Sequence, residues 1–256
     1  MAPPPLHGQR DQPPGVPPLE LTGERTLPDV PAENYWYRRH LAVYEWIAER
    51  VRGRRVVDLA CGEGYGSAVL ARTAASVVGV DANPEAFEHA RLRYVTPNLR
   101  FERDLVETWS GEVDCVVFLQ TIEHVADPGA LLDSIGRLAG PGGISYVSTP
   151  NVLTLAPAGA ERSDNPWHVH EYRPGEFATL CRRHFGRVEL LGIHHARKLR
   201  LHQLAVERLA WDAVHTRLKL TRRFYGAFGP AISARDFAIR GGDLERSLDL
   251  LAVLRR

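Results

Sequence analysis

Asp58-Leu59-Ala60-Cys61-Gly62-Glu63-Gly64-Tyr65-Gly66 is the stretch that decides the fold of this chain. It follows a short apolar run over 54–58, which predicts a buried strand, and it leads into a helical pattern over about 65–73. A turn between a strand and the next helix is where an open parallel sheet binds its ligand. Glycines in such a turn adopt positive φ and let the backbone approach a ligand closely. The stretch therefore predicts a ligand site at the edge of a sheet.

The same alternation of strand and helix continues outward from this turn. Strands are expected at 54–58, 76–80, 99–101, 113–119, 144–148, 188–193 and 248–253. Helices are expected at 33–52, 65–73, 84–93, 128–139 and 174–184. Repeated strand–helix units predict an α/β fold with a doubly wound, seven-stranded parallel sheet, and continuously apolar strands agree with burial on both faces. The last strand is expected to pair antiparallel with the sixth, after a helical insert.

Length and composition limit the class of protein. The chain has 256 residues, 44% of them apolar and 25% charged, with a formal net charge of +1. These values are typical of a folded globular protein and argue against a chain built for nucleic acid. There is no run of 18 apolar residues and no apolar signal segment at the N-terminus, so we expect a cytoplasmic protein. The three cysteines show no paired spacing, which predicts neither a disulfide framework nor a zinc site.

Two segments do not follow the predicted alternation of strands and helices. Residues 1–31 contain nine of the 18 prolines, which predicts a flexible tail before a domain over 32–256. Residues 194–245 form an insert that we expect to act as a cap or lid, and its part over 197–223 carries eight Lys or Arg. This basic part suits a solvated helix face, a lid for an anionic acceptor, or contact with an anionic membrane surface. Its few aromatic residues argue against nucleic-acid stacking.

Acidic residues at three strand ends indicate the ligand. The spacing Gly62-x-Gly64-x-Gly66 differs from the dinucleotide pattern, and Asp58 would repel a pyrophosphate but attract a cationic amino group. Asp81 ends the second strand, where an acid accepts hydrogen bonds from ribose hydroxyls. Asp104 follows the third strand and could bond the amine of adenine or cap a helix. A ligand with a ribose and a cationic amino acid, such as S-adenosylmethionine, fits these residues.

These segments, in this order, resemble class I S-adenosylmethionine-dependent methyltransferases. The similarity rests on the glycine motif, on Val77–Asp81, on Arg103-Asp104-Leu105, on Leu119–Val125 and on Gly140-Pro141-Gly142-Gly143. It covers residues 33–193 and implies a Rossmann-like fold with S-adenosylmethionine as cofactor. The cofactor-binding residues it implies are Asp58, Ala60, Gly62, Gly64, Tyr65, Asp81, Ala82, Asp104, Leu105, Gln120, Tyr37 and Arg39. Tyr37 and Arg39 lie on the first helix, which closes over the cofactor in the family; packing is the other interpretation of these two residues.

A second set of motifs is similar to a bacterial branch that includes sugar O-methyltransferases, a mycofactocin oligosaccharide methyltransferase among them. These motifs are Thr22-Gly23-Glu24-Arg25, Arg39-His40-x-x-x-Tyr44, Ser148-Thr149-Pro150-Asn151 and Asn165–Glu171. The branch often lies beside glycosyltransferases or in natural-product clusters. The resemblance implies O-methylation of a sugar, a glycan or a related small molecule.

Three histidines are the candidates for catalysis. A sugar hydroxyl is a poor nucleophile, and a base at hydrogen-bond distance contributes about 10²–10⁴-fold. His124 follows the fourth strand, whereas His168 and His170 lie on the loop after the fifth, where alternation would turn them to opposite sides. Glu171 could orient an imidazole or join a metal site, but no carboxylate cluster supports a metal, and we predict none.

The main hypothesis is therefore an S-adenosylmethionine-dependent O-methyltransferase of a small molecule or glycan, with a histidine as base. An N- or C-methyltransferase of a specialised metabolite is the second hypothesis. A non-catalytic subunit of the same fold that supports a partner enzyme is the third, and an NAD-binding oxidoreductase the last. The acceptor is the expected partner, no nucleic acid is expected, and the oligomeric state stays open.

Overall fold

A computed structural model describes residues 12–23, 25–28, 30–157, 159–209 and 222–256. They form one eight-stranded sheet in the order β3-β2-β1-β4-β5-β8-β6-β7. The strands are β1 Arg55–Leu59, β2 Ser76–Val80, β3 Leu99–Glu102, β4 Cys115–Leu119, β5 Ile144–Pro150, β6 Arg187–His195, β7 Phe237–Arg240 and β8 Asp249–Arg255. The α-helices are α1 Asn34–Ala48, α2 Tyr65–Ala71, α3 Pro84–Arg93, α4 Pro128–Ala139, α5 Val152–Leu155, α6 Pro174–His184, α7 Arg197–Leu209 and α9 Arg222–Phe228.

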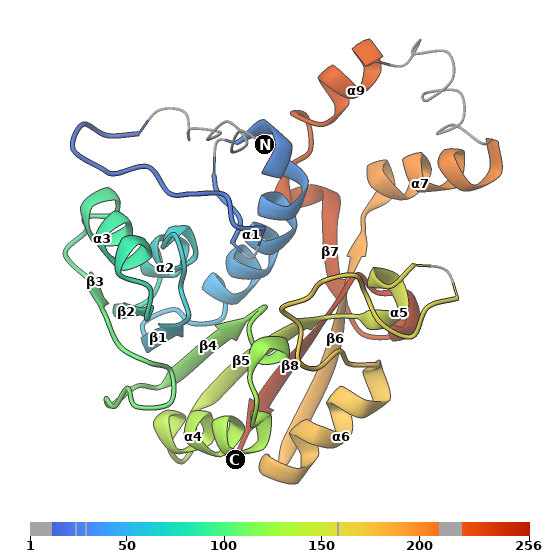
Figure 1. Ribbon diagram of the computed structural model, residues 1–256. Coiled ribbons are helices and arrows are strands. Elements are labelled where there is room, and N and C mark those ends of the chain that lie inside the picture. The colour runs from blue at the N-terminus through green and yellow to red at the C-terminus, as the bar shows by residue number, and fades with distance from the viewer. Residues whose placement is uncertain (1–11, 24, 29, 158, 210–221) are drawn as a thin grey trace.

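Helices lie on both sides of the sheet (Figure 1), and apolar side chains pack between them and its two faces. Side chains alternate between the faces of a strand, so Val56 packs toward α1 and α2 whereas Val57 packs toward α4 and α6. The strands from β3 to β5 are parallel, with β1 between β2 and β4. The order reverses beside β1, and this is the point where a doubly wound sheet opens toward a ligand. The predicted α/β Rossmann-like fold is confirmed.

The far side of the sheet confirms one prediction and corrects another. β8 lies between β5 and β6 and runs antiparallel to both, as expected for the last strand. The predicted number of seven strands is wrong, because β7 adds an eighth by pairing antiparallel with the outer edge of β6. β7 has only four residues, Phe237-Ala238-Ile239-Arg240, and so short a run was included in the insert. Its strand conformation depends on the edge that β6 offers, which sequence periodicity does not reveal.

The tail and the insert both contact the body of the domain. Leu19, Leu27 and Val30 are buried in a small cluster of their own, and His89 on α3 donates through Nδ1 to the carbonyl of Pro17 at 2.7 Å. The insert begins after β6, which ends at His195, and α7 and α9 project beyond the end of the sheet (Figure 1). Residues 1–11 of the predicted tail and 210–221 of the insert lie outside the described residues. Flexibility of the tail and a lid function stay predictions.

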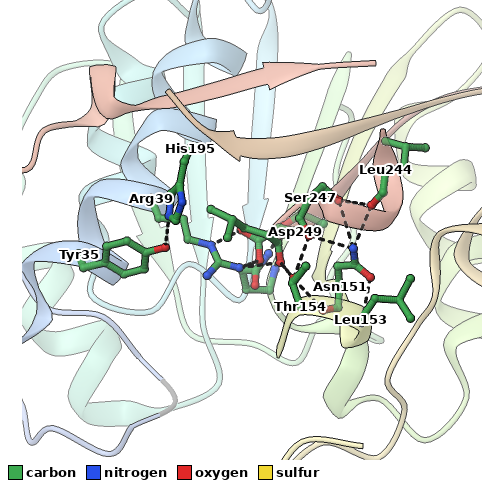
Figure 2. A network of polar contacts seen from close by, with 12 residues as sticks. Tyr35, Arg39, Asn151, Leu153, Thr154, His195, Leu244, Ser247 and Asp249 are labelled. Atoms are coloured by element: carbon green, nitrogen blue, oxygen red, sulfur yellow. Dashed lines mark hydrogen bonds and ion pairs between the residues drawn. The ribbon is translucent and has the colours of Figure 1, made fainter. Parts of the chain in front are cut away.

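A buried polar network joins the first helix to the last strands (Figure 2). Arg39 on α1 donates through Nε to Asp249 Oδ2 at 2.6 Å and through Nη2 to the carbonyl of Leu248 at 2.8 Å. Beside it, the amide of Asn151 donates to the carbonyls of Leu244 and Ser247, at 2.9 and 2.8 Å. These bonds fix the carboxyl end of β5 and the 3-10 turn Leu244–Arg246 against α1.

Two further predictions concern cysteine and membrane segments. All three cysteines, Cys61, Cys115 and Cys181, are buried and unpaired. Within the described residues, every helix is too short or too polar to cross a membrane.

Candidate functional site

The glycine-rich turn between β1 and α2 forms one wall of a small cavity. Ala60, Gly62 and Gly64 have φ values of 56°, 57° and 94°, so the chain turns sharply at the carboxyl end of β1. Only glycine suits position 64, because a Cβ there would lie 2.8 Å from the Cβ of Ala90. At Gly62 a Cβ would meet open space. The turn therefore exposes backbone groups to the cavity.

This cofactor cavity has a volume of about 100 Å³ and lies at the sheet edge predicted from the sequence. Ala60, Gly62, Tyr65 and Gln120, all predicted cofactor residues, are among its lining residues. Gln120 has a φ of 50° and donates through Nε2 to Ser148 Oγ at 2.9 Å. Thr26, from the N-terminal segment, also lines the cavity and lies 3.0 Å from the hydroxyl of Tyr65.

Asp58 does not line this cavity, contrary to the expected contact with a cationic amino group. Its side chain is completely buried below the turn, where Oδ1 accepts from Tyr44 Oη at 3.2 Å and Oδ2 from Ser67 Oγ at 2.6 Å. Burial raises the pKa of Asp58 to about 7, although both hydrogen bonds lower it. The carboxyl group thus holds α1 and α2 against the end of β1.

Asp81 and Asp104, the acids after the second and third strands, have lone pairs left for hydrogen bonds to a ribose and an adenine. Asp81 Oδ2 accepts from the backbone amide of Gly62 at 2.8 Å and Oδ1 from that of Asn83 at 2.9 Å. Each of these oxygens has a second lone pair for a ribose hydroxyl. Asp104 Oδ1 accepts from the amide of Leu105 and from Thr108 Oγ1, both at 2.7 Å. The side chain of Leu105 is exposed, as is Ala82, which leaves room for a ring beside them.

The two predicted residues on α1 have different surroundings. The ring of Tyr37 packs edge-on against Tyr65 with ring centroids 5.0 Å apart, so it lies behind the cavity wall. The guanidinium of Arg39 is buried in the ion pair with Asp249 and does not line the cavity, so a cofactor contact of Arg39 stays a prediction that this geometry does not support. The contacts of Arg39 fit the other interpretation given for this residue, that it packs the first helix against the domain.

A second cavity of about 380 Å³ adjoins the first, and Thr26, His40 and Gln120 line both. We call it the acceptor cavity. Burial lowers the pKa of His40 to about 4, and the positive charge of Arg39 lowers it further against the opposing charge of Asp249. The His40 ring is therefore neutral at pH 7. A molecule in the acceptor cavity would lie directly beside one in the cofactor cavity.

Two of the three predicted catalytic histidines line the acceptor cavity. His124 donates through Nδ1 to the carbonyl of Trp167 at 3.0 Å, because a carbonyl can only accept. His168 Nδ1 lies 2.8 Å from Glu171 Oε1. His168 therefore has Nε2 as its acceptor nitrogen, and the centroids of the two rings are 5.0 Å apart. His170 is not among the lining residues of this cavity and its ring lies beside Tyr172, with centroids 6.1 Å apart, so its catalytic role stays a prediction that this geometry does not support.

Glu171 orients His168, as the sequence suggested. Its carboxylate also accepts from the backbone amide of Ser163 at 2.8 Å and from the Ser163 hydroxyl. Burial acts to raise the pKa of Glu171, but these hydrogen bonds and His168 hold it below its usual value. Glu171 is therefore ionised at pH 7, and it favours the tautomer of His168 that carries its proton on Nδ1.

A group that could hold a metal ion also lies at this wall. Glu123, His124 and His168 place one ligand atom each within 4.8 Å of one another. Sequence reasoning predicted no metal, because it searched for several carboxylates. His168 Nε2 lies 3.1 Å from the amide nitrogen of Asn165, and a metal would have to displace this donor.

Several site residues were not assigned a role from the sequence. Tyr44 and His40 appeared only within a motif, and Thr26 lay in the segment interpreted as a tail. The signal for Tyr44 was a hydroxyl on an otherwise apolar helix stripe, since a buried hydroxyl needs a partner such as Asp58. No sequence signal indicates that Thr26 would reach Tyr65.

A family model described as a methyltransferase domain matches residues 35–204. The chain belongs to this methyltransferase family. It is similar to a "Probable S-adenosylmethionine-dependent methyltransferase" of Mycolicibacterium smegmatis, with 35% identity over 92% of this chain and 94% of the relative. A relative in Mycobacterium tuberculosis with the same description is 34% identical over 97% of this chain and 96% of its own length.

Two further similarities cover different parts of this methyltransferase. A "Ubiquinone biosynthesis O-methyltransferase" of Albidiferax ferrireducens is 36% identical over 54% of this chain and 62% of the relative. A Thermotoga maritima structure described as a "SAM-dependent methyltransferase, possible histamine N-methyltransferase" has a TM-score of 0.57 at 14% identity. It covers 88% of this chain and 94% of that chain, and at this identity it shows the fold alone.

The methyltransferase is an enzyme that uses S-adenosylmethionine. The residues at the carboxyl ends of β1 to β3 have groups that suit this cofactor, although Asp81, Asp104 and Leu105 lie outside the lining of the small cofactor cavity. The backbone at Gly62 faces open space, Asp81 has lone pairs for the ribose, and Asp104 with Leu105 suits adenine.

Proposed function

We propose that this methyltransferase transfers the methyl group to a hydroxyl of a sugar, glycan or related small molecule, with His168 as the base. The observation that carries the proposal is the position of His168, which Glu171 contacts from behind the lining, on the wall of a cavity that shares three lining residues with the cofactor cavity. A base held by a carboxylate serves an acceptor that must lose a proton, such as a hydroxyl. A neutral amine needs no such base before attack.

The lining of the acceptor cavity supports a sugar as the acceptor. Glu33, Gln120 and Asn165 offer hydrogen-bonding groups to hydroxyls, and Trp36 offers an indole that is 40% exposed. Trp167, next to the cavity residue His168, is 64% exposed. Exposed indoles with polar neighbours suit the mixed apolar and hydroxyl faces of a sugar ring. Relatives named ubiquinone biosynthesis O-methyltransferase support transfer to oxygen over part of the chain.

The residues of the chain have distinct tasks in this reaction. When bound, S-adenosylmethionine supplies an electrophilic methyl group on a sulfonium centre. Gln120, His40 and Thr26 line the boundary at which the acceptor hydroxyl meets that group. The hydroxyl takes the place of the Asn165 amide at His168 Nε2 and gives its proton to this nitrogen as the carbon–oxygen bond forms and the bond from the methyl carbon to sulfur breaks, which leaves a neutral thioether. The ionised Glu171 then stabilises the imidazolium through Nδ1.

The experiment that tests this proposal uses purified protein, methyl-labelled S-adenosylmethionine and a deproteinised extract of the source cells. Chromatography and mass spectrometry locate the label. Label on the oxygen of sugar-containing molecules is the expected result. Label on an amine or a carbon would contradict O-methylation and leave the cofactor site intact. Cofactor binding without any transfer would instead favour the hypothesis of a subunit that needs a partner enzyme.

A further inference from the structure

A cationic pocket lies beyond the carboxyl end of β6, outside the acceptor cavity. It has a volume of about 670 Å³, and Arg200 from α7, Arg240 from the end of β7 and Arg246 from the turn Leu244–Arg246 line it. His194 and His195 on β6 also line it, and among the described residues Asp243 is the one acid in the lining. Three arginines from separate elements thus line a pocket with one carboxylate.

The charges of this pocket are not balanced by the chain. Among the described residues, Arg200, Arg240 and Arg246 form neither ion pairs nor side-chain hydrogen bonds. His194 is only 5% exposed, and its Nε2 forms no hydrogen bond with any described group. Burial lowers the pKa of His194, and the positive charge of Arg240 lowers it further. The pocket therefore has an excess of positive charge, which an anion would neutralise.

An apolar cavity of about 530 Å³ opens beside the cationic pocket and shares His195 and Gln203 with it. It lies between α7 and α9, and Leu199, Val206, Phe228 and Ile232 line it. The ring of Phe228 stacks on His202, with centroids 4.7 Å apart. A ligand that reached from one cavity to the other would have a negatively charged head and an apolar tail.

Neighbouring residues of α1 line the apolar cavity and the acceptor cavity. The hydroxyl of Tyr35 lies 2.7 Å from His195 Nε2, the contact at the left of Figure 2. Tyr35 lines the apolar cavity, and its ring packs edge-on against Trp36, which lines the acceptor cavity. A ligand with its sugar near His168 and its charged group near Arg246 would have to pass Tyr35 and Trp36.

We propose that the two cavities bind a phosphate joined to a hydrocarbon chain, so that the acceptor glycan is carried on a lipid phosphate. The inference extends the proposed function, because it names the carrier of the sugar that His168 would activate. The cationic pocket takes the phosphate, and the cavity between α7 and α9 takes the first part of the chain. A free sugar phosphate would use only the cationic pocket.

Calorimetric titration of the full chain with dodecyl phosphate, below its critical micelle concentration, tests this site without any methyl transfer. Inorganic phosphate is the comparison. Each buried methylene is worth about fourfold in affinity, so burial of three predicts binding of dodecyl phosphate about 60-fold tighter than that of inorganic phosphate. Arg240→Gln and Arg246→Gln should each weaken both ligands about tenfold. Phe228→Ala should weaken dodecyl phosphate only.

Arg187→Gln is the matched control, since Arg187 is exposed at the opposite end of β6. It should bind both ligands as the unchanged protein does, and circular dichroism checks the fold of every variant. Equal affinity for the two ligands would overturn the lipid proposal in favour of a free anion. Absence of binding, or an affinity that Arg240→Gln and Arg246→Gln leave unchanged, would overturn the site itself. This experiment measures binding and not methyl transfer, so a negative result would not bear on O-methylation, which the labelling experiment tests.

Discussion

The guanidinium of Arg39 and the carboxylate of Asp249 form a buried ion pair between the first helix and the last strand (Figure 2). Removal of one partner leaves the other charge buried and unpaired, which costs about 3–5 kcal/mol. Arg39→Ala should therefore lower the free energy of unfolding by this amount, measured by urea denaturation. Arg91→Ala is the control, because its pair with Glu88 is exposed to solvent and should contribute little to stability. Equal losses in both variants would contradict the structural role of Arg39.

Asp81 connects the glycine-rich turn to the cofactor. Asp81→Ala removes the acceptor for the Gly62 amide as well as the two bonds expected to the ribose. Loss of such bonds costs about 1–3 kcal/mol, so the Kd for S-adenosylhomocysteine should rise about 5- to 150-fold. Calorimetry provides the measurement, and Glu107→Gln, at an exposed acid beyond β3, should leave the Kd unchanged. An unaltered Kd in Asp81→Ala would place the ribose elsewhere.

Several element boundaries could be predicted because local chemistry determines them. α3 and α4 begin at Pro84 and Pro128, and the side chains of Asn83 and Asp127 cap them, as their sequence pattern indicates. The glycine turn and Asp81 were also predictable, since adjacent strands of a parallel sheet end at one edge. Contacts between residues far apart in the sequence could not be predicted. The partner of Arg39 lies 210 residues away, and nothing near Arg39 in the sequence indicates an acid there.

Asp58 should make the stability of the protein depend on pH. Its pKa is raised from 3.8 to about 7 by burial, so between these values only the unfolded state has released the proton. The folded state then binds more protons, and the free energy of unfolding falls as pH rises, by at most about 1.4 kcal/mol per pH unit. Asp58→Asn should flatten the curve between pH 5 and 7 in urea denaturation. Parallel curves for both proteins would show that Asp58 is ionised throughout.

The group formed by Glu123, His124 and His168 raises the question of whether methyl transfer requires a metal ion. We expect methyl transfer to survive dialysis against EDTA, because the Asn165 amide already lies at His168 Nε2 and a base needs that lone pair. Turnover with and without added Mn²⁺ or Zn²⁺ is the measurement. Loss of activity on chelation, with recovery on adding either ion, would instead make these three side chains metal ligands. Glu123→Gln should then lower the affinity for the ion.

His168 and His170 allow a matched comparison, since they lie two residues apart and only His168 lines the acceptor cavity. His168→Asn removes the base, so kcat should fall by about 10²–10⁴-fold while the Kd for the cofactor stays the same. His170→Asn should retain most of kcat. Glu171→Gln should lower kcat by less than His168→Asn does, because it removes the charge that stabilises the imidazolium but leaves the base in place. Methyl transfer to the acceptor found by labelling measures all three. Full turnover in His168→Asn would exclude His168 as the base and favour an acceptor that needs no deprotonation.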